Sequence, residues 1–81
     1  MKYIVYGQQG CNFCARAQNL LTVEGKPYKY IDILDNPEDR HWIVEVEEHK
    51  TVPQIYVENA RGVTEYIGGF EELQDHLMEN D

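Results

Sequence analysis

Gly10-Cys11-Asn12-Phe13-Cys14 decides how the rest of the chain is interpreted, because it places two thiols two residues apart between two apolar segments. The preceding segment, Lys2 to Tyr6, contains β-branched and aromatic residues without alternation, which is typical of a strand covered on both faces. From Cys11 onward the apolar residues recur at helical spacing, and Gly25 and Pro27 are expected to end that helix. The sequence therefore predicts that the two cysteines open a helix after a buried strand.

A parallel βαβ unit and a second helix are the next expectations. A strand is predicted at Tyr28 to Ile33, and a strand, a helix of about a dozen residues and another strand form a right-handed crossover. Asn36 and Pro37 suit a helix start, because asparagine can accept from free backbone amides and proline tolerates the first helical position. This helix is predicted to run to about Glu48, with an apolar face of Trp42, Ile43 and Val46.

The C-terminal part of the chain predicts a hairpin and a last helix. The hairpin strands are expected at Gln54 to Val57 and Thr64 to Ile67. The last helix follows Gly68-Gly69, and its apolar face is predicted to contain Phe70, Leu73, Leu77 and Met78. The predicted order is β-α-β-α-β-β-α, an α/β fold. The 81 residues suffice for one small domain, 1–81, with a frayed acidic tail at 79–81.

Composition and charge narrow the functional classes. The chain has 15 acidic and 7 basic residues and a formal net charge of −8, which repels nucleic-acid backbones and anionic membrane surfaces. We therefore expect a monomer with no nucleic-acid and no membrane partner. The N-terminus has no apolar run long enough for a signal peptide or a membrane span, and a single Cys-x-x-Cys loop would stabilise the fold little. These features favour a reducing, cytoplasmic location.

The two thiols can form a redox pair, contribute half of a metal site, or be a coincidence. A thiolate is the form that attacks disulfides, and the free amides of a helix N-terminus stabilise it, so Cys11 is the predicted nucleophile. Cys14 lies one turn further on, within reach of a disulfide to Cys11, and fits the resolving role. A zinc site would need further ligands such as His41 and His49. Their spacing is not that of common zinc sites, so we expect two surface histidines and no metal.

Two further motifs accompany the cysteines: Thr51-Val52-Pro53, and Gly68-Gly69-Phe70-Glu71-Glu72-Leu73. Together with the Cys-x-x-Cys they resemble the glutaredoxin family, and the resemblance covers essentially the whole chain. It implies a thioredoxin-like fold, in which a four-stranded mixed sheet carries helices on both faces. It also implies a cis peptide bond before Pro53, so that the backbone of Val52 pairs with the cysteinyl part of the substrate.

The resemblance further implies a site for glutathione as a co-substrate, with no bound cofactor. In this family the turn into the last helix binds the γ-glutamyl end, and here Glu71 replaces the usual small hydroxyl residue while Glu72 replaces an aspartate. Arg16, Arg40 and Lys50 are the candidates to meet the glycyl carboxylate, with Lys50 ranked first. The predicted glutathione contacts are Phe13, Lys50, Thr51, Val52, Pro53, Gly69, Phe70, Glu71 and Glu72.

The predicted function is that of a thiol–disulfide oxidoreductase in electron transport and cell redox homeostasis. Its Cys11/Cys14 dithiol would reduce protein disulfides or glutathione mixed disulfides and be recycled by glutathione. The resemblance implies protein substrates such as ribonucleotide reductase. One alternative is a glutaredoxin-like redoxin recycled by thioredoxin reductase, which the altered Glu71-Glu72 site favours. Another is an iron–sulfur carrier in which Cys11 and two glutathiones hold a cluster between two subunits, which Asn12, in place of a common proline, permits.

Overall fold

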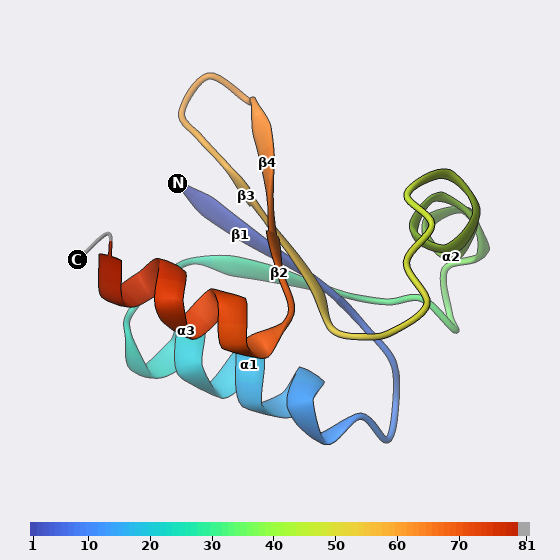
Figure 1. Ribbon diagram of the computed structural model, residues 1–81, viewed down its shortest axis with the longest axis horizontal. Coiled ribbons are helices and arrows are strands. Elements are labelled where there is room, and N and C mark those ends of the chain that lie inside the picture. The colour runs from blue at the N-terminus through green and yellow to red at the C-terminus, as the bar shows by residue number, and fades with distance from the viewer. Residues whose placement is uncertain (80–81) are drawn as a thin grey trace.

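The strands form a four-stranded sheet of order β2-β1-β3-β4 in the computed structural model, which describes residues 1–79 (Figure 1). β1 pairs in parallel with β2 and antiparallel with β3, and β3 pairs antiparallel with β4. The predicted mixed sheet and element order are thus confirmed, with one π-helical segment, η1, added after α2. In chain order the elements are β1 (Lys2–Gly7), α1 (Asn12–Val23), β2 (Tyr28–Asp32), α2 (Pro37–His41), η1 (Trp42–Val46), β3 (Gln54–Glu58), β4 (Thr64–Gly68) and α3 (Phe70–Glu79).

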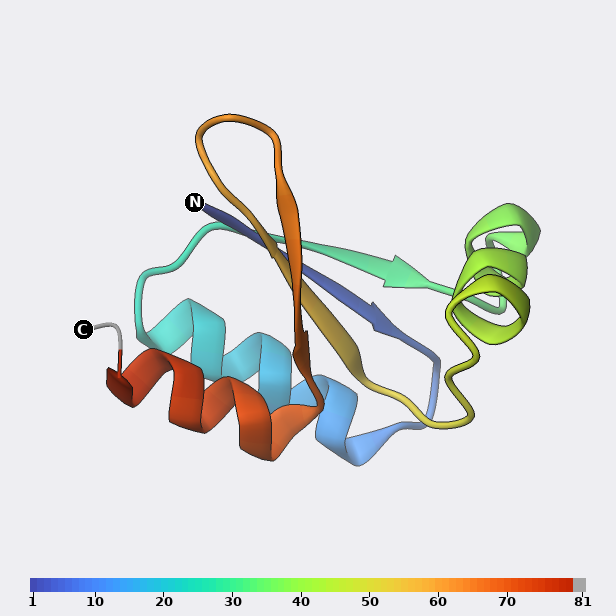
Figure 2. The ribbon, with the colours of Figure 1, turned by 45° about the horizontal axis from the view of Figure 1, so that its top comes forward.

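Side chains of the two central strands alternate between two hydrophobic clusters, one on each face of the sheet. Tyr3 and Val5 of β1 pack with Ile55 and Val57 of β3 against α1 and α3. The helices contribute Ala17, Leu21, Leu73 and Leu77 to this cluster. Figure 2 shows α1 and α3 side by side on this face. Because both clusters draw on β1, that strand is covered on both sides, as its non-alternating sequence predicts.

The opposite face is covered by a smaller cluster beneath η1. Tyr6 and Tyr56 point to this side of the sheet and pack with Ile33 and Ile43, and Trp42 lies against them. The Tyr6, Trp42 and Tyr56 rings are mutually in contact, with centroid separations of 5.3 to 5.7 Å. Helical segments therefore cover both faces of the sheet, as the family resemblance implies.

The second helix begins at Pro37 as predicted, but it differs from the prediction in its capping, its geometry and its end. Asn36 precedes Pro37 at the helix start, but its amide donates to the Asp32 carbonyl over 2.8 Å instead of capping the helix. The α-helix ends at His41, and the chain continues as η1, in which the Glu47 N–H bonds to the Trp42 carbonyl five residues back. This wider turn rotates Val46 away from Ile43. Val46 is consequently 58% exposed, so its assignment to the apolar face is wrong.

Two other assignments need correction. Met78 is 79% exposed although the helical spacing places it with Leu77, because the buried stripe of α3 is narrow and contains Leu73 and Leu77. His49 is half-buried and hydrogen-bonded to Tyr56, whereas His41 is exposed as predicted. The predicted frayed tail falls partly on residues 80 and 81, which lie outside the described residues, and Glu79 ends α3.

Two backbone features that the sequence predicts are confirmed. Gly25 follows the C-terminus of α1 with a φ of +68°, in the left-handed region that glycine tolerates. The Val52–Pro53 peptide bond is cis. Among residues 1–79, no helix combines the length and the apolar character that crossing a membrane requires.

Candidate active site

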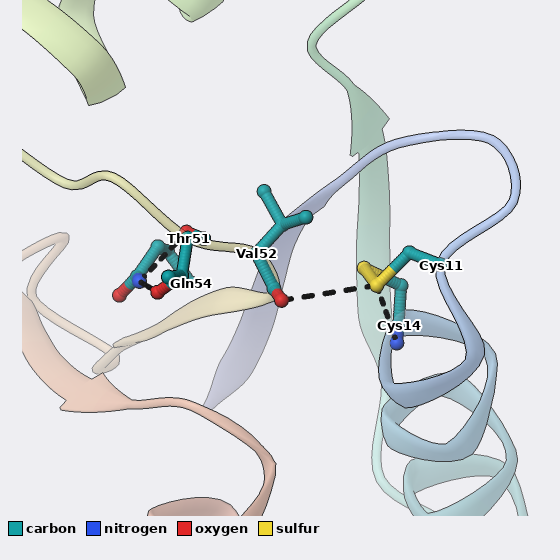
Figure 3. Close-up of a disulfide and its surroundings, with 5 residues drawn as sticks. All are labelled: Cys11, Cys14, Thr51, Val52 and Gln54. Carbon is teal, nitrogen blue, oxygen red and sulfur yellow. Dashed lines mark hydrogen bonds between the residues drawn. A yellow bond between two sulfur atoms is a disulfide. The ribbon is translucent and has the colours of Figure 1, made fainter.

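Cys11 and Cys14 lie at the N-terminus of α1 and are joined by a disulfide (Figure 3). β1 ends at Gly7, and a short loop through Gly10, with a φ of +83°, leads into the helix. Cys11 is the N-cap residue, and its sulfur accepts a hydrogen bond of 3.2 Å from the backbone N–H of Cys14. Cys14 is buried, with 1% of its surface exposed, whereas Cys11 is partly exposed. Only Cys11 is therefore directly accessible to a partner.

The start of α1 favours negative charge on the Cys11 sulfur once the disulfide is reduced. The Cys14 amide already points at this sulfur, and the helix dipole adds partial positive charge at the same end. The first turn, beginning at Asn12, contains no acidic residue that would repel a thiolate. These groups stabilise the reactive form of Cys11 rather than its neutral thiol.

The loop before β3 faces the disulfide. The Cys11 sulfur lies 3.8 Å from the carbonyl oxygen of Val52, and Figure 3 shows this carbonyl directed at the sulfur. In the disulfide this is a contact only, because no S–H is present to donate. Val52 is half-buried and Pro53 is buried behind it. The main-chain edge at Val52 is thus adjacent to the sulfur that a substrate would engage.

One cavity of about 350 Å³ brings together almost all of the predicted glutathione contacts. Its aromatic wall is formed by Phe13 and Phe70, whose ring centroids lie 5.9 Å apart. The guanidinium of Arg16 lies over the Phe13 ring, 5.1 Å from its centroid. The predicted residues that line this cavity, here called the acidic cavity, are Phe13, Thr51, Val52, Pro53, Gly69, Phe70, Glu71 and Glu72.

The carboxylates of the acidic cavity come from the first turn of α3. Glu72 accepts a hydrogen bond of 2.8 Å from the backbone N–H of Gly69, so it caps its own helix. Gly68 adopts a φ of +131°, and a Cβ at that position would lie 2.7 Å from Glu72 Cγ. Glycine at this position therefore lets the Glu72 side chain fold back over the turn. Glu71 remains exposed at the cavity.

Lys50 does not line the acidic cavity but a second one, of about 520 Å³. Arg40, the other expected cation, lines the same second cavity, here called the basic cavity. Thr51 and Val52 line both cavities and therefore lie between them. Among the described lining residues, the acidic cavity contains two carboxylates and no lysine or arginine, and the basic cavity contains Arg40 and Lys50 and no carboxylate. A ligand lying along Val52 would therefore meet opposite charges at its two ends.

Gln54 and Tyr66 line the acidic cavity but are absent from the predicted site. Gln54 directly follows Pro53, and Tyr66 lies on β4 opposite Tyr56. Burial raises the pKa of Tyr66, and the nearby Glu72 and Glu47 carboxylates raise it further. Its hydroxyl therefore remains a protonated hydrogen-bond donor at neutral pH. The position of Gln54 next to the Thr51-Val52-Pro53 motif was the only sequence signal for either residue.

The histidines considered as zinc ligands do not join the cysteines. His49 bonds through Nε2 to the Tyr56 hydroxyl at 3.0 Å and stacks on the Tyr66 ring at 4.9 Å. Within the described part of the chain, residues 1–79, no group of three or more His, Cys, Asp or Glu side chains is arranged to hold a metal ion.

Comparisons with known proteins identify the family of the chain. The family model described as Glutaredoxin matches residues 3–61. A probable monothiol glutaredoxin of Legionella pneumophila is 31% identical over 71 residues, which cover 88% of this chain and 74% of that protein. The solution structure of a glutaredoxin from Brucella melitensis is 31% identical and superposes with a TM-score of 0.74, covering 99% of this chain and 82% of the other.

The structure of reduced glutaredoxin from Escherichia coli is also 31% identical, with a TM-score of 0.71 and coverage of 99% of this chain and 96% of that one. Both superpositions therefore cover nearly the whole of this chain, from the sheet to the helices that pack on it. Accordingly, this chain, with its Cys11–Cys14 disulfide, belongs to the glutaredoxin family of thiol–disulfide oxidoreductases.

Proposed function

We propose that the protein is a dithiol glutaredoxin that reduces disulfides of proteins, or their mixed disulfides with glutathione, and is itself reduced by glutathione. Cys11 is the nucleophile and Cys14 the resolving thiol. The observation that carries the proposal is the position of the accessible Cys11 sulfur, 3.8 Å from the Val52 carbonyl and hydrogen-bonded to the Cys14 amide. Disulfide-containing proteins, with ribonucleotide reductase as the candidate that the family suggests, are the proposed partners of a cytoplasmic monomer.

The reaction transfers two electrons from the dithiol to the substrate. The Cys11 thiolate attacks one sulfur of the substrate disulfide, forms a mixed disulfide and releases the other sulfur as a thiolate that takes up a proton. Cys14, as its thiolate, then attacks the Cys11 sulfur and releases the second substrate thiol, which leaves the Cys11–Cys14 disulfide. One glutathione opens that disulfide by forming a mixed disulfide at Cys11, and a second displaces it as glutathione disulfide, so both cysteines return to thiols.

The two cavities support glutathione as the recycling thiol. Glutathione has an ammonium and a carboxylate at its γ-glutamyl end and a single carboxylate at its glycyl end. The acidic cavity offers Glu72 to the ammonium, and the basic cavity offers Arg40 and Lys50 to the glycyl carboxylate. With its cysteinyl part along Val52, the tripeptide would extend from one cavity to the other.

A second candidate function keeps the same chemistry but uses thioredoxin reductase as the electron source. The observation that favours it is the carboxylate pair at the start of α3, where Glu72 occupies the Gly69 amide and Glu71 repels the γ-glutamyl carboxylate. Weak glutathione binding would leave an enzymatic reductant as the effective donor.

One experiment separates the two candidates. The oxidised protein is incubated either with glutathione, glutathione reductase and NADPH, or with thioredoxin reductase and NADPH, and NADPH consumption is followed with a protein disulfide as the final acceptor. Rapid turnover with the glutathione system supports the proposal. Turnover only with thioredoxin reductase supports the second candidate, and no turnover with either system contradicts both.

A further inference from the structure

Gln54 is a buried polar residue, 5% exposed, whose side chain is fully engaged beside the reactive edge. Its Nε2 donates to the Thr51 carbonyl oxygen at 2.9 Å and to the Thr51 hydroxyl at 3.2 Å. Its Oε1 accepts from the Tyr66 hydroxyl at 2.6 Å. Figure 3 shows Gln54, at the start of β3, close to Thr51 on the loop that presents Val52 to Cys11. The three bonds connect β3, β4 and this loop.

The chemistry of the partners fixes which way the Gln54 amide faces. A backbone carbonyl can only accept, so the amide nitrogen must face Thr51 and the amide oxygen must face Tyr66. The Tyr66 hydroxyl then has to donate, and its raised pKa keeps its proton in place. The Tyr66 ring is itself held by stacking on His49, with an interplanar angle of 24°. The amide is therefore held from both sides.

The bonds between Gln54 and Thr51 enclose Val52 and Pro53, the two residues whose position matters most for a substrate. Thr51 and Gln54 flank Val52 and Pro53, so an amide that ties Gln54 to the Thr51 backbone closes a short loop around them. Gln54 is also the first residue of β3 and pairs with Tyr6 of the central strand. The loop is thereby anchored to the rigid centre of the sheet, while the Val52 carbonyl stays 3.8 Å from the Cys11 sulfur.

We infer that Gln54, oriented by Tyr66, is a positioning residue that holds the Val52 edge in place for peptide substrates. It acts through Thr51 and Val52 and does not touch the reacting sulfurs. The inference rests on the proposed function, because it requires the Val52 backbone to pair with the substrate. A loosened edge weakens the docking of a peptide disulfide, whereas the stabilisation of the Cys11 thiolate by the Cys14 amide is unaffected.

The test compares two disulfides that differ in their need for this edge. One is a cysteine-containing peptide in mixed disulfide with glutathione, and the other is 2-hydroxyethyl disulfide, which has no peptide groups to pair with Val52. Gln54→Met removes the amide at similar size, and Tyr66→Phe removes only the hydroxyl while keeping the ring on His49. Gln74→Met, at an exposed position on α3, is the matched control.

Gln54→Met is expected to raise KM for the peptide disulfide about two- to tenfold, the effect of losing a hydrogen bond or two, with kcat unchanged. The single-turnover rate of the pre-reduced variant with 2-hydroxyethyl disulfide should equal that of the native protein. Tyr66→Phe should shift KM in the same direction, and Gln74→Met should have no effect.

An equal loss of both reactions would assign Gln54 a merely structural role and overturn the inference, as would an unchanged peptide KM. If Gln54→Met does not fold, the same comparison on Tyr66→Phe decides. If the native protein reduces neither disulfide, the proposed function itself is contradicted. If the native protein is active but the variants lose both reactions equally, only the role of Gln54 is contradicted.

Discussion

The backbone N–H of Cys14 donates to the sulfur of Cys11 over 3.2 Å, so the buried cysteine helps to stabilise charge on the accessible one. This bond comes from the backbone and survives replacement of the Cys14 side chain. We therefore expect Cys14→Ser to retain a reactive Cys11 that forms a stable mixed disulfide with glutathione. Cys11→Ser should abolish disulfide reduction, because the remaining thiol is 1% exposed.

Mass spectrometry after incubation with glutathione disulfide measures both outcomes. The glutathione adduct is expected on Cys14→Ser and absent from Cys11→Ser. The double variant, with no thiol, is the control for non-covalent adducts. An adduct on Cys11→Ser alone would reverse the assignment of the two roles.

Glu71 lies in the acidic cavity, where a carboxylate repels the γ-glutamyl carboxylate of glutathione. Glu71→Gln is expected to lower the KM for glutathione about two- to fivefold at low salt, the range of an exposed charge interaction, and less at high salt. Steady-state kinetics at two ionic strengths measure the effect.

Glu24→Gln is the matched control for that substitution, because it removes the same formal charge at the C-terminal end of α1, opposite to the disulfide. If Glu24→Gln lowers KM as much as Glu71→Gln does, the net charge of −8, and not the cavity, governs the encounter with glutathione.

Lys50 and Arg40 allow the basic cavity to be tested separately. Replacing Lys50 with Gln removes a cation that can meet the glycyl carboxylate, so the KM for glutathione should rise about two- to fivefold. Lys29→Gln, at an exposed position on β2, serves as the control. Equal effects of the two substitutions would argue against a role for the basic cavity.

Local sequence patterns were sufficient for the elements that position the cysteines. The non-alternating strand, the helix spacing after Cys11 and the Gly25 stop are each read within one segment, and all three are found. The features that were missed depend on contacts between segments. Val46 turns outward because the chain leaves α-helical geometry after His41, which no residue between Pro37 and Val46 signals by itself.

The residues of the candidate site also fall into those that motifs predict and those that depend on contacts between segments. Motifs and family resemblance place eight predicted contacts in one cavity, but Lys50 lies on the other side of Val52 in the basic cavity. Gln54 and Tyr66 are twelve residues apart, and only the pairing of β3 with β4 brings the amide and the hydroxyl within 2.6 Å. A single sequence contains no local pattern from which such a bond follows.

Gly7 packs directly against the resolving thiol. A Cβ at this position would lie 2.9 Å from Cys14 Sγ and 2.6 Å from the Tyr30 hydroxyl oxygen. Both distances are shorter than a real Cβ contact, so Gly7→Ala must displace both atoms, and overpacking of this kind costs about 1–3 kcal/mol. Because Cys14 is displaced and Cys11 is not, the mixed disulfide should resolve more slowly and accumulate during turnover.

Quenched-flow sampling with mass spectrometry measures that accumulation. Gly25→Ala is the control. Alanine is strained at the φ of +68° found there and destabilises the fold, but its Cβ meets open space far from Cys14. Slow resolution in both variants would attribute the effect to lost stability and not to the contact with Cys14.

Tyr56 couples stability to alkaline pH. Burial raises its pKa far above the ordinary value of 10.0, and the hydrogen bond to Glu47, 2.7 Å long, and the charge of that carboxylate raise it further. The folded state therefore keeps a proton that the unfolded state releases above about pH 10. The stabilisation is fully present below that pH and is lost as pH rises, so the free energy of unfolding should fall by about 1.4 kcal/mol per pH unit for this group.

Urea unfolding between about pH 8 and about pH 11 measures how steeply the free energy of unfolding falls. Tyr6, Tyr30 and Tyr66 contribute to the same fall, because their pKa values are also raised. Tyr56→Phe loses the bonds to Glu47 and His49 and should be less stable at pH 8, but its stability should decline less steeply above pH 10. Glu47→Gln removes the negative charge while leaving a side-chain oxygen that can accept, and its slope should be intermediate. Native and Tyr56→Phe slopes that coincide would show that Tyr56 does not retain its proton more strongly in the folded state.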